Sequence, residues 1–504
     1  MRTKDVLHYQ TPEAVGISSR DVEAYIRLLE SRHLATHDVL MARGNQIFYE
    51  HYWKPFTSDF RHRMYSVSKS FVALAVGFLV QDGLAALDDP MSLYFPEELQ
   101  GQEDRNMHRQ TIRQMLTMST AKQDRNWFRA QTEDRVRFYF ANDRKETRPP
   151  GTIFDYDSTG SFVLGALVER LTGKTLMAYL KEKLFDEIGV RPDASCLRCP
   201  GGHSWGDSGI LCTPMDLLRV ARFTLNGGSW DGKQLLDREY VKAATSKQID
   251  NNYAEIHCCD SYGYGYLIWR TYQDSFFFDG MGCQFAVCVP EQDLILIYNA
   301  DNQGKAGAHH VIIDGFFDCI VNRAASGPIA EDRQGLEQLQ AYSEGLKLAA
   351  AEGPAHSGFE KSVEGKVWYF QDNPMGISKM KLTFSGEKGC LSYTNAQGDK
   401  ELTFGMGCNE FGLFPQEGYS ADVGSCFAPG NYYHCAASAA WVEERKLRIL
   451  VQIIDRYFGN LSITLGFTED EVGVYMEKNA EFFLNEYAGF GCASCRREIT
   501  CTES

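Results

Sequence analysis

The stretch Ser66-Val67-Ser68-Lys69-Ser70-Phe71 places a hydroxyl three residues before an amine, at the start of an apolar segment. On a helix, side chains three residues apart share a face, so the Lys69 amine can reach the Ser66 hydroxyl. A serine becomes a good nucleophile when a neighbouring base takes its proton, and an unprotonated lysine can be that base. The stretch therefore predicts a nucleophile together with its base.

The Ser-x-x-Lys pattern alone is weak evidence, because roughly one or two matches are expected by chance in a chain of this composition. It also occurs at Ser119–Lys122 and Ser385–Lys388. Only the match at Ser66 opens a long apolar helix, Phe71–Val80. A helix start exposes N–H groups that favour developing negative charge. On spacing alone, the alternative that Ser66 caps a core helix and Lys69 is solvated stays open.

The chain has 504 residues, which exceeds the usual size of one domain. A hydrophobic content of 44% and a charged content of 23% are typical of a soluble globular protein. The net charge of −16 argues against a nucleic-acid partner and against binding to an anionic membrane. The amino end has no apolar signal core, and no run of about 18 apolar residues occurs. We therefore expect a cytoplasmic protein without a membrane-spanning helix.

Fifteen cysteines are many, but their number is odd and their spacing is irregular, so we expect mostly reduced thiols. Two clusters resemble parts of a metal site: Cys196, Cys199 and His203, and Cys492, Cys495 and Cys501. Each offers three possible ligands, whereas a structural zinc usually takes four. We expect no cofactor and no metal, although the sequence leaves the second cluster undecided.

Strand patterns flank a helical middle region. A predicted helix over 18–34 precedes a hairpin of Val39–Arg43 and Gln46–Tyr52 around Gly44-Asn45. Further helices are predicted near 111–118, 161–171, 215–225 and 309–321, and strands near 265–269, 275–278, 285–289 and 294–298. This order predicts an α+β domain whose antiparallel sheet is completed by distant ends of the segment.

The remainder of the chain changes character. Residues 326–358 predict a linker with one surface helix, so the first domain is expected to span 1–325. Residues 359–504 contain strand patterns about ten residues apart with Gly and Asn turns, which predict an antiparallel barrel or sandwich. For this last domain both a packing role and a lid role stay open, because fold alone does not define function.

Two more segments carry chemistry. In the loop Gly151–Ser158, Tyr156 and Ser158 stand two residues apart and can turn both hydroxyls into one cleft, where a tyrosine can transfer protons. The segment Gly280-Met281-Gly282-Cys283-Gln284 lies between two predicted strands. Its glycines let the backbone approach a substrate closely, and an N–H there can help to form an oxyanion hole.

Together these segments resemble the serine β-lactamase-like family, which includes class C β-lactamases, penicillin-binding proteins and related esterases and amidases. The likeness covers about residues 11–322. It also includes Pro12–Ser18, Leu87–Pro90, Tyr94–Glu97, Gly209–Leu217 and Tyr262–Tyr266. The resemblance implies a β-lactamase-like antiparallel sheet flanked by helices. Lipocalin-like or other small β domains are often appended to this family.

The resemblance also implies roles for individual residues. Ser66 would attack a carbonyl and form an acyl-enzyme, with Lys69 and Tyr156 in proton transfer. Ser158 would donate a hydrogen bond. The N–H groups of Ser66 and of Cys283, or of a close neighbour such as Gly282, would hold the oxyanion.

This chain departs from the family pattern twice. The Tyr-x-Asn element reads Tyr156-Asp157-Ser158, and the Lys-Thr-Gly strand has no cation, because Asp279-Gly280-Met281-Gly282 stands in its place. That cation helps to bind the carboxylate of penicillins, so a β-lactam should bind poorly here. The strand looks more like that of the 6-aminohexanoate-dimer hydrolase branch.

The expected function is a serine hydrolase acting on a small amide or ester, with oligomeric state and substrate identity left open. The alternatives are an inactive binding or scaffold protein, or a true β-lactamase or D,D-peptidase. Five aromatic residues could shape the acyl pocket, although core packing is their more frequent role: Trp127, Phe128, Tyr262, Tyr264 and Phe278. The histidines His203, His257, His309 and His310 are expected at the surface or satisfied in the core.

Overall fold

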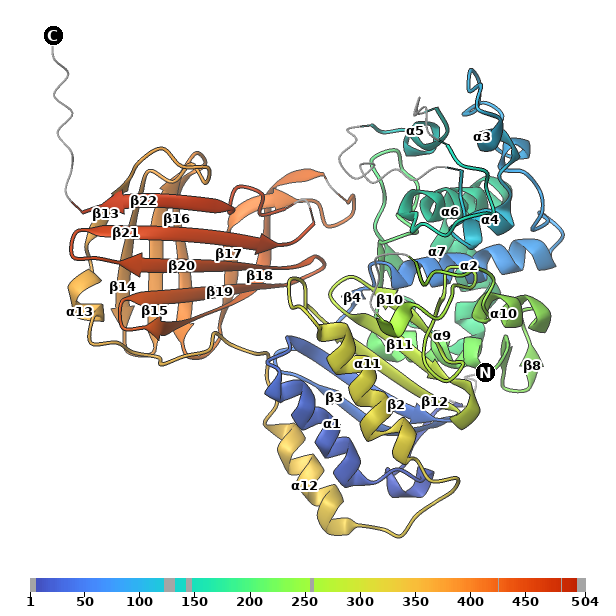
Figure 1. Cartoon of the computed structure of the whole chain (residues 1–504), viewed down its shortest axis with the longest axis horizontal. Coiled ribbons are helices and arrows are strands. Elements are labelled where there is room, and N and C mark those ends of the chain that lie inside the picture. The colour runs from blue at the N-terminus through green and yellow to red at the C-terminus, as the bar shows by residue number, and fades with distance from the viewer. Residues whose placement is uncertain are drawn as a thin grey trace. The chain divides into compact units, whose positions relative to one another are not determined.

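The computed structural model describes residues 6–121, 132–141, 147–253, 258–424, 426–481 and 483–495 (Figure 1). It contains two compact units. The first comprises Met1–Lys347 and a short later segment, Asp422–Ser425; the second comprises Leu348–Ala421 and Cys426–Ser504. The boundary after Lys347 lies inside the segment expected to be a linker.

The first unit is built on a seven-stranded sheet with the order β1-β3-β2-β12-β11-β10-β9. Its strands are β1 (His8–Tyr9), β3 (Gln46–Tyr52), β2 (Thr36–Arg43), β12 (Leu294–Ala300), β11 (Gln284–Val289), β10 (Phe276–Gly280) and β9 (Trp269–Arg270). All neighbouring pairs are antiparallel except β1 and β3. The pairing of β2 with β12, with Leu40 opposite Ile297, confirms that distant ends complete the sheet.

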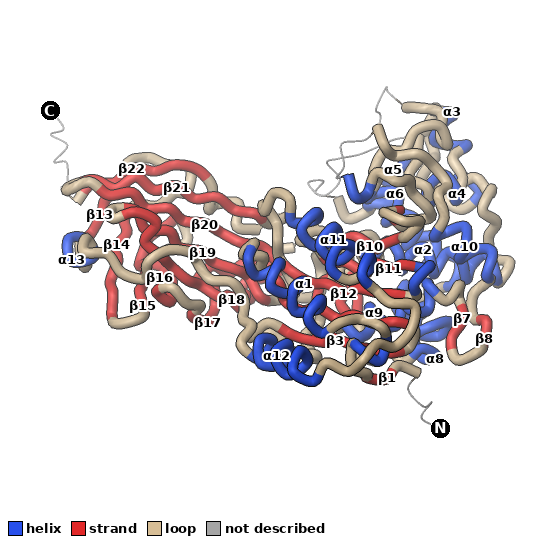
Figure 2. The backbone as a smooth tube through the Cα atoms, turned by 60° about the horizontal axis from the view of Figure 1, so that its bottom comes forward, coloured by secondary structure: helices blue, strands red, loops and turns tan. Residues whose placement is uncertain are grey.

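A layer of helices covers one face of this sheet (Figure 2). Helix α1 (Ser19–Ser31) starts at the N-cap Ser18 and buries Val22, Ile26 and Leu29. It packs on α11 (Ala308–Cys319), where the Tyr25 hydroxyl donates to the Ile312 carbonyl over 3.1 Å. Helix α12 (Arg333–Glu344) extends the layer by packing on α1.

The helical middle region forms the rest of the first unit. Its longest helices are α2 (Val67–Gln81), α6 (Ser158–Thr172) and α9 (Pro214–Leu225). Helix α2 is buried on nearly all sides, as an apolar helix without a polar face must be. Shorter helices surround it: α3 (Arg105–Arg109), α4 (Ile112–Leu116), α5 (Arg135–Ala141), α7 (Leu176–Leu180), α8 (Asp186–Ile188) and α10 (Arg238–Thr245).

One predicted strand is wrong over most of its length. Of residues 265–269, only Trp269 belongs to a strand, the short β9. Gly265 donates to the Ile268 carbonyl over 2.8 Å, and Leu267 adopts a positive φ of 54°. This turn is incompatible with the extended backbone that the apolar run indicated.

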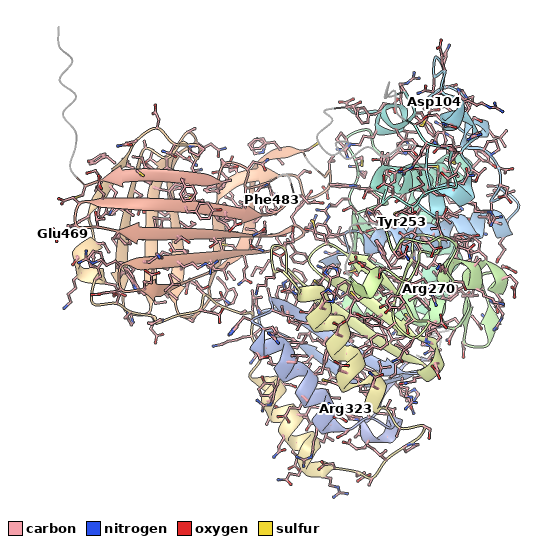
Figure 3. All side chains as sticks on the ribbon, in the orientation of Figure 1. Asp104, Tyr253, Arg270, Arg323, Glu469 and Phe483 are labelled. Atoms are coloured by element: carbon pink, nitrogen blue, oxygen red, sulfur yellow. The ribbon has the colours of Figure 1, made fainter. Side chains whose placement is uncertain are left out.

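The second unit is built on an antiparallel sheet of β13 (Val367–Phe370), β14 (Lys379–Ser385), β15 (Lys388–Asn395), β16 (Gly398–Met406), β17 (Glu410–Tyr419), β18 (Phe427–Glu443), β19 (Lys446–Ile454), β20 (Phe458–Phe467), β21 (Glu471–Asn479) and β22 (Gly489–Ser494). A parallel pairing of β16 with β18 closes this sheet into a barrel, and β17 pairs with β18 at the end of the strand order. The closure decides between the barrel and the sandwich. Buried and exposed residues alternate along β21, so one face of each strand fills the interior. Phe483, labelled in Figure 3, packs on Tyr433 and Tyr457 in this unit.

No helix in the described ranges combines the length and the apolarity needed to cross a membrane.

Candidate active site

Ser66 stands at the amino end of α2, immediately after a strained residue. Tyr65 has a φ of 46°, which non-glycine residues rarely adopt and which costs of order 1–3 kcal/mol. The Tyr65 ring is buried under the Arg63 guanidinium, whose Cζ lies 4.3 Å from the ring centroid. Ser66 itself is half-buried, so the bend presents its hydroxyl at an accessible position.

Lys69 is held by two acceptors. Its Nζ lies 2.8 Å from Ser66 Oγ and 2.7 Å from the main-chain carbonyl of Asp207. The side chain is 1% exposed. Lys69 is therefore not a solvated surface cation, and its amine is aimed at the serine.

The loop that carries the Asp207 carbonyl is fixed by buried contacts. Arg63, on β4 (His62–Arg63), donates from Nε to the Ser208 carbonyl over 2.9 Å and from Nη2 to Ser208 Oγ over 3.1 Å. Gly206 packs so closely that a Cβ there would lie 3.1 Å from Val72 of α2. These contacts explain why Asp207 keeps its carbonyl directed toward Lys69.

The segment Asp422–Ser425 supports the same loop. Arg198 donates its N–H to the Asp422 carbonyl over 2.9 Å and accepts from the Gly424 N–H over 2.8 Å. A Cβ on Gly424 would lie only 1.8 Å from the Trp205 ring. A part of the chain distant in sequence thus packs directly against Trp205, two residues before Asp207.

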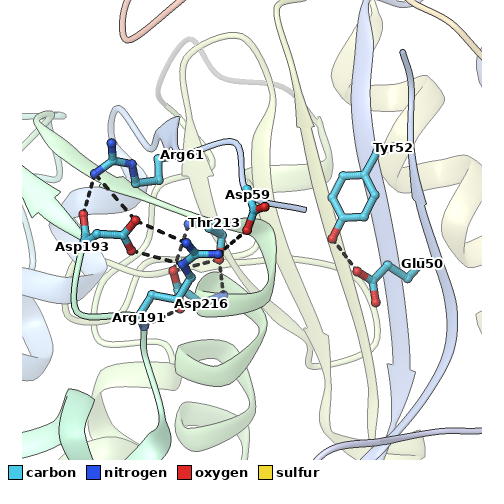
Figure 4. A network of polar contacts seen from close by, with 8 residues as sticks. All are labelled: Glu50, Tyr52, Asp59, Arg61, Arg191, Asp193, Thr213 and Asp216. Carbon is cyan, nitrogen blue, oxygen red and sulfur yellow. Dashed lines mark hydrogen bonds and ion pairs between the residues drawn. The ribbon is translucent and has the colours of Figure 1, made fainter. Parts of the chain in front are cut away.

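An ion-pair network contacts the loop that precedes β4 (Figure 4). Arg191 lies between Asp59, which it contacts, and Asp193, whose Oδ1 is 3.1 Å from Arg191 Nε. The Arg191 N–H donates to Asp216 Oδ1 over 2.8 Å, and Asp216 also accepts from the Thr213 hydroxyl at the start of α9. Exposed ion pairs contribute about 0–1 kcal/mol each, so this network orients the loop rather than stabilising the fold.

Tyr156 lies next to Lys69. The Lys69 Nζ is 5.2 Å from the centroid of the Tyr156 ring. That ring stacks on Trp269, with centroids 5.7 Å apart and an interplanar angle of 17°. The preceding loop is tied down at Phe154, whose N–H donates to the hydroxyl of Tyr253 over 2.6 Å.

Asp157 and Ser158, which follow Tyr156, have different surroundings. Asp157 caps α6: its Oδ1 accepts from the Gly160 N–H over 2.9 Å and its Oδ2 from the Thr120 hydroxyl over 2.7 Å. Burial raises the pKa of Asp157 to about 6, although these two hydrogen bonds oppose the shift. Ser158 begins α6 and is half-buried, and among the described residues its hydroxyl has no hydrogen-bond partner. The capping role of Asp157 could have been predicted from the sequence, because an aspartate directly before an apolar helix is a typical N-cap.

The turn after β10 lies against the start of α2. A Cβ on Gly280 would lie 2.3 Å from the Met64 carbonyl, so only glycine allows this approach. The Cys283 N–H donates to the Gly280 carbonyl over 3.0 Å, and the Gly282 carbonyl accepts from the Asn302 N–H over 3.1 Å. The Cys283 N–H expected to hold an oxyanion is therefore engaged within the turn. In the described part of the chain, nothing accepts a hydrogen bond from the Met281 N–H.

A histidine from α11 joins this turn. His309 Nε2 lies 3.5 Å from Asp279 Oδ1, and His309 Nδ1 lies 3.8 Å from Cys283 Sγ. Burial disfavours the charged ring, but Asp279 outweighs it and raises the pKa of His309 to about 11. Asp260 lies nearby with a pKa of about 7, raised by its burial and by Asp279. The expectation of a surface or satisfied core histidine overlooked this contact, because nothing near His309 in the sequence indicates it.

The cysteine clusters have other contacts. Arg135 Nη1 lies 3.2 Å from Cys199 Sγ, and His203 pairs with Glu169 at 2.7 Å. Cys495 Sγ lies 3.6 Å from Asp470, whereas Cys501 lies outside the described residues. Within those residues, no group of three or more His, Cys, Asp or Glu side chains is arranged to hold a metal ion.

The aromatic candidates separate into two groups. Tyr264 and Phe278 are buried, and Tyr264 packs on Phe154 and Trp269 beside Tyr156. Tyr262 is 48% exposed. Trp127, Phe128 and also His257 lie outside the described residues.

Comparison with known proteins agrees with this geometry. The family model Beta-lactamase matches residues 23–312, so the chain belongs to that family. The 6-aminohexanoate-dimer hydrolase of Paenarthrobacter ureafaciens is 27% identical over 227 residues, which cover 41% of this chain and 56% of that protein. Esterase EstB of Burkholderia gladioli is 27% identical over 205 residues, which cover 36% of this chain and 52% of that protein. The chain thus spans only about half the length of these two relatives.

One solved structure shares the fold. "Putative 6-aminohexanoate-dimer hydrolase from Bacillus anthracis" has a TM-score of 0.51 and 18% sequence identity. The match covers 63% of this chain and 87% of that chain. It supports the β-lactamase-like architecture.

Proposed function

We propose that this protein is a serine hydrolase that cleaves a small amide or ester through an acyl-enzyme on Ser66. The observation that carries the proposal is the 2.8 Å contact of Lys69 Nζ with Ser66 Oγ, at a strained and accessible bend. Membership of the Beta-lactamase family and relatives named as a dimer hydrolase and an esterase support it.

In the first half-reaction, Ser66 Oγ bonds to the substrate carbonyl carbon while its proton passes to unprotonated Lys69. The tetrahedral intermediate then collapses and the bond to the leaving amine or alcohol breaks. Tyr156 gives its hydroxyl proton to the leaving group and takes up the proton that Lys69 received from Ser66. In the second half-reaction, water attacks the acyl-enzyme and the same groups take and return the proton. Ser66 is regenerated and the acid is released.

An oxyanion formed on the substrate needs two hydrogen-bond donors close to Ser66 Oγ. The Ser66 N–H is one candidate, and it donates to no described residue. Because the Cys283 N–H closes the turn, we assign the second donor to the Gly282 N–H or the Met281 N–H, neither of which donates to a described residue. The Ser158 hydroxyl, at the start of α6, is proposed to donate a hydrogen bond to the bound substrate.

The substrate is proposed to lack a carboxylate near the reacting carbonyl. The end of β10 next to Ser66 carries Asp279 in place of the lysine found in β-lactamases. A carboxylate bound there would face Asp279, which already pairs with His309 and stands where the lactamases have a lysine, so a penicillin should react slowly. Rapid hydrolysis of nitrocefin would contradict this part of the proposal.

A fluorophosphonate probe tests the nucleophile. Wild-type protein should be labelled and Ser66→Ala should not. The matched control is Ser385→Ala, which changes the serine of another Ser-x-x-Lys match at the end of β14 and should label like wild type. An unlabelled wild type would favour the inactive binding protein, and a labelled Ser66→Ala protein would remove Ser66 from the mechanism.

A substrate panel then identifies the class. Para-nitrophenyl esters, D-amino-acid amides and linear ω-amino-acid dimers should be assayed with wild type and Ser66→Ala. Turnover that depends on Ser66 in one class defines the acyl group and separates an amidase from an esterase.

A further inference from the structure

We propose that His309 is a positioning residue that holds the oxyanion turn, Gly280–Cys283, from both of its ends. The inference rests on the proposed function, because it concerns the turn that would stabilise the oxyanion on Ser66. It assigns a role to a residue on α11, a helix that contributes nothing else to the proposed chemistry.

Two contacts of one imidazole ring carry the inference. Nε2 lies 3.5 Å from Asp279 Oδ1, and Asp279 directly precedes Gly280 at the start of the turn. Nδ1 lies 3.8 Å from the thiol of Cys283, the last residue of the turn. The two nitrogens therefore reach both ends of the segment that carries the Met281 N–H.

The ring is held in place independently of these contacts. It packs edge-on against Phe285 of β11, with centroids 4.9 Å apart and an interplanar angle of 68°. Helix α11 runs alongside the sheet in both views of the fold (Figures 1 and 2). Because the His309 ring is anchored on α11, it can fix the position of the turn relative to the helix layer.

The turn needs such a support, because its backbone is strained. Gly282 and Cys283 both have positive φ, at 82° and 71°, and the second is not a glycine. Strained conformations persist only where surrounding contacts determine them. Gly280 cannot move toward α2 either, since the Met64 carbonyl already lies against its Cα.

The positive charge of His309 gives it an electrostatic role in addition to its packing on Phe285. With the pKa of His309 near 11, the ring is an imidazolium at neutral pH. Asp279 contacts the ring, and the buried Asp260, 3% exposed, interacts electrostatically with both groups. A neutral replacement of similar size leaves Asp279 without its cationic partner, so we expect Asp279 and the turn behind it to shift.

The test compares His309→Gln with wild type on the best p-nitrophenyl ester. Misplacement of a transition-state donor by about 1 Å costs on the order of a hundredfold, so we expect kcat to fall by about ten- to a hundredfold. KM should change less than about twofold, since the turn acts on the transition state rather than on the bound ester. The rate of fluorophosphonate labelling should fall in parallel with kcat, because phosphonylation also needs the oxyanion donors.

The neighbouring histidine provides the matched control. His310 is on the same helix, and its Nδ1 lies 3.4 Å from Asp314, one turn further along α11. His310→Gln should leave kcat, KM and labelling as in wild type. If Asp279 and His309 act as one unit, the double variant His309→Gln with Asp279→Asn should be no slower than His309→Gln alone.

The outcomes separate this inference from the proposed function. Wild-type kcat in His309→Gln, or a raised KM with unchanged kcat, would overturn the role of His309 while the loss of activity in Ser66→Ala upholds the hydrolase. Activity retained in Ser66→Ala would overturn the proposed function itself, and with it the role of His309. If His309→Gln does not fold, Asp279→Asn decides by the same readouts, because it removes the contact at one end and keeps the ring.

Discussion

At the scale of single residues, the amine of Lys69 is placed by one neighbour on its own helix and one far away in sequence. Ser66 is three residues away, whereas Asp207 is 138 residues away and contributes only its main-chain carbonyl. Both acceptors are needed to aim the amine, because a buried lysine with one partner could rotate away from the serine.

Lys69→Met tests the base while keeping the length of the side chain. Removal of a general base costs about 10²- to 10⁴-fold, so kcat and the labelling rate should fall at least a hundredfold. Stopped-flow labelling and steady-state kinetics measure both. Lys388→Met is the control, since Lys388 belongs to another Ser-x-x-Lys match and pairs with Glu410 at the surface. Activity of Lys69→Met within tenfold of wild type would exclude Lys69 as the base.

Asp157 should make stability depend on pH in an unusual direction. Its folded pKa of about 6 exceeds the value of about 4 in an unfolded chain, so the folded protein holds a proton that the unfolded chain has released. The contribution of Asp157 to the free energy of unfolding therefore falls as pH rises from about 4 to above 6, by roughly 3 kcal/mol for a shift of this size.

Asp157→Asn removes this titration and keeps an N-cap. Urea unfolding between pH 4.5 and 7.5 should show wild type losing stability relative to the variant as pH rises. A difference between the two proteins that stays constant, or that grows in favour of wild type, would contradict the raised pKa.

The proposed site residues that could be predicted from the sequence are those whose signal is local. Ser66 and Lys69 are related by helix geometry, and Tyr156 by a loop before a helix. Asp207 had no such signal, because any residue type offers a carbonyl. His309 had none either, because its partners Asp279 and Cys283 reach it only through the pairing of strands and the packing of α11.

At the scale of elements, the contact between β10 and α2 determines whether the turn reaches Ser66. This contact depends on Gly280, where a Cβ would lie 2.3 Å from the Met64 carbonyl and 3.3 Å from Val67. Backbone cannot yield as the end of a flexible side chain can, so any added atom must separate the strand from the helix.

Gly280→Ala should therefore impair activity more than it impairs folding. Overpacking costs about 1–3 kcal/mol of stability, but a displaced oxyanion donor should lower kcat by about a hundredfold. Steady-state kinetics and thermal unfolding measure the two effects. Gly466→Ala is the control, because Gly466 lies within β20 with no atom within 4 Å of its added Cβ. Unchanged kcat in Gly280→Ala would show that β10 can move away from α2 without loss of activity.

The elements that were predicted correctly are those with a strong pattern, such as α1, α2, the β2–β3 hairpin and β12. Strand β18 escaped prediction although it spans Phe427–Glu443. Its buried positions are largely alanine, including Ala436, Ala437, Ala439 and Ala440. Alanine has a low strand propensity, so pairing with β17 and β19 rather than local preference determines this strand.

At the scale of the whole molecule, the first unit incorporates a segment from the far end of the chain. The sequence indicated a change of character after residue 325, but it gave no sign that Asp422–Ser425 belongs with the first unit. The reason is that the hydrogen bonds to Arg198 use only main-chain atoms.

Gly424→Ala tests this arrangement. A Cβ would lie 1.8 Å from the Trp205 ring, so the segment must withdraw and Arg198 loses two main-chain hydrogen bonds. We expect a lower unfolding midpoint, and a kcat lowered by about tenfold if the Asp207 carbonyl shifts with Trp205. Gly412→Ala, in β17 with open space around its Cβ, should behave as wild type. If both variants match wild type, the contact is dispensable.

The inserted segment also limits how this gene can be divided or recombined. A protein ending at Lys347 would contain the seven-stranded sheet, the helices of the first unit and every proposed catalytic group, yet it would lack the strand-like partner of Arg198. The Trp205 ring, now covered by Gly424, would meet water. Exchange of the barrel for another module should therefore succeed only when the donor sequence supplies its own equivalent of Asp422–Ser425.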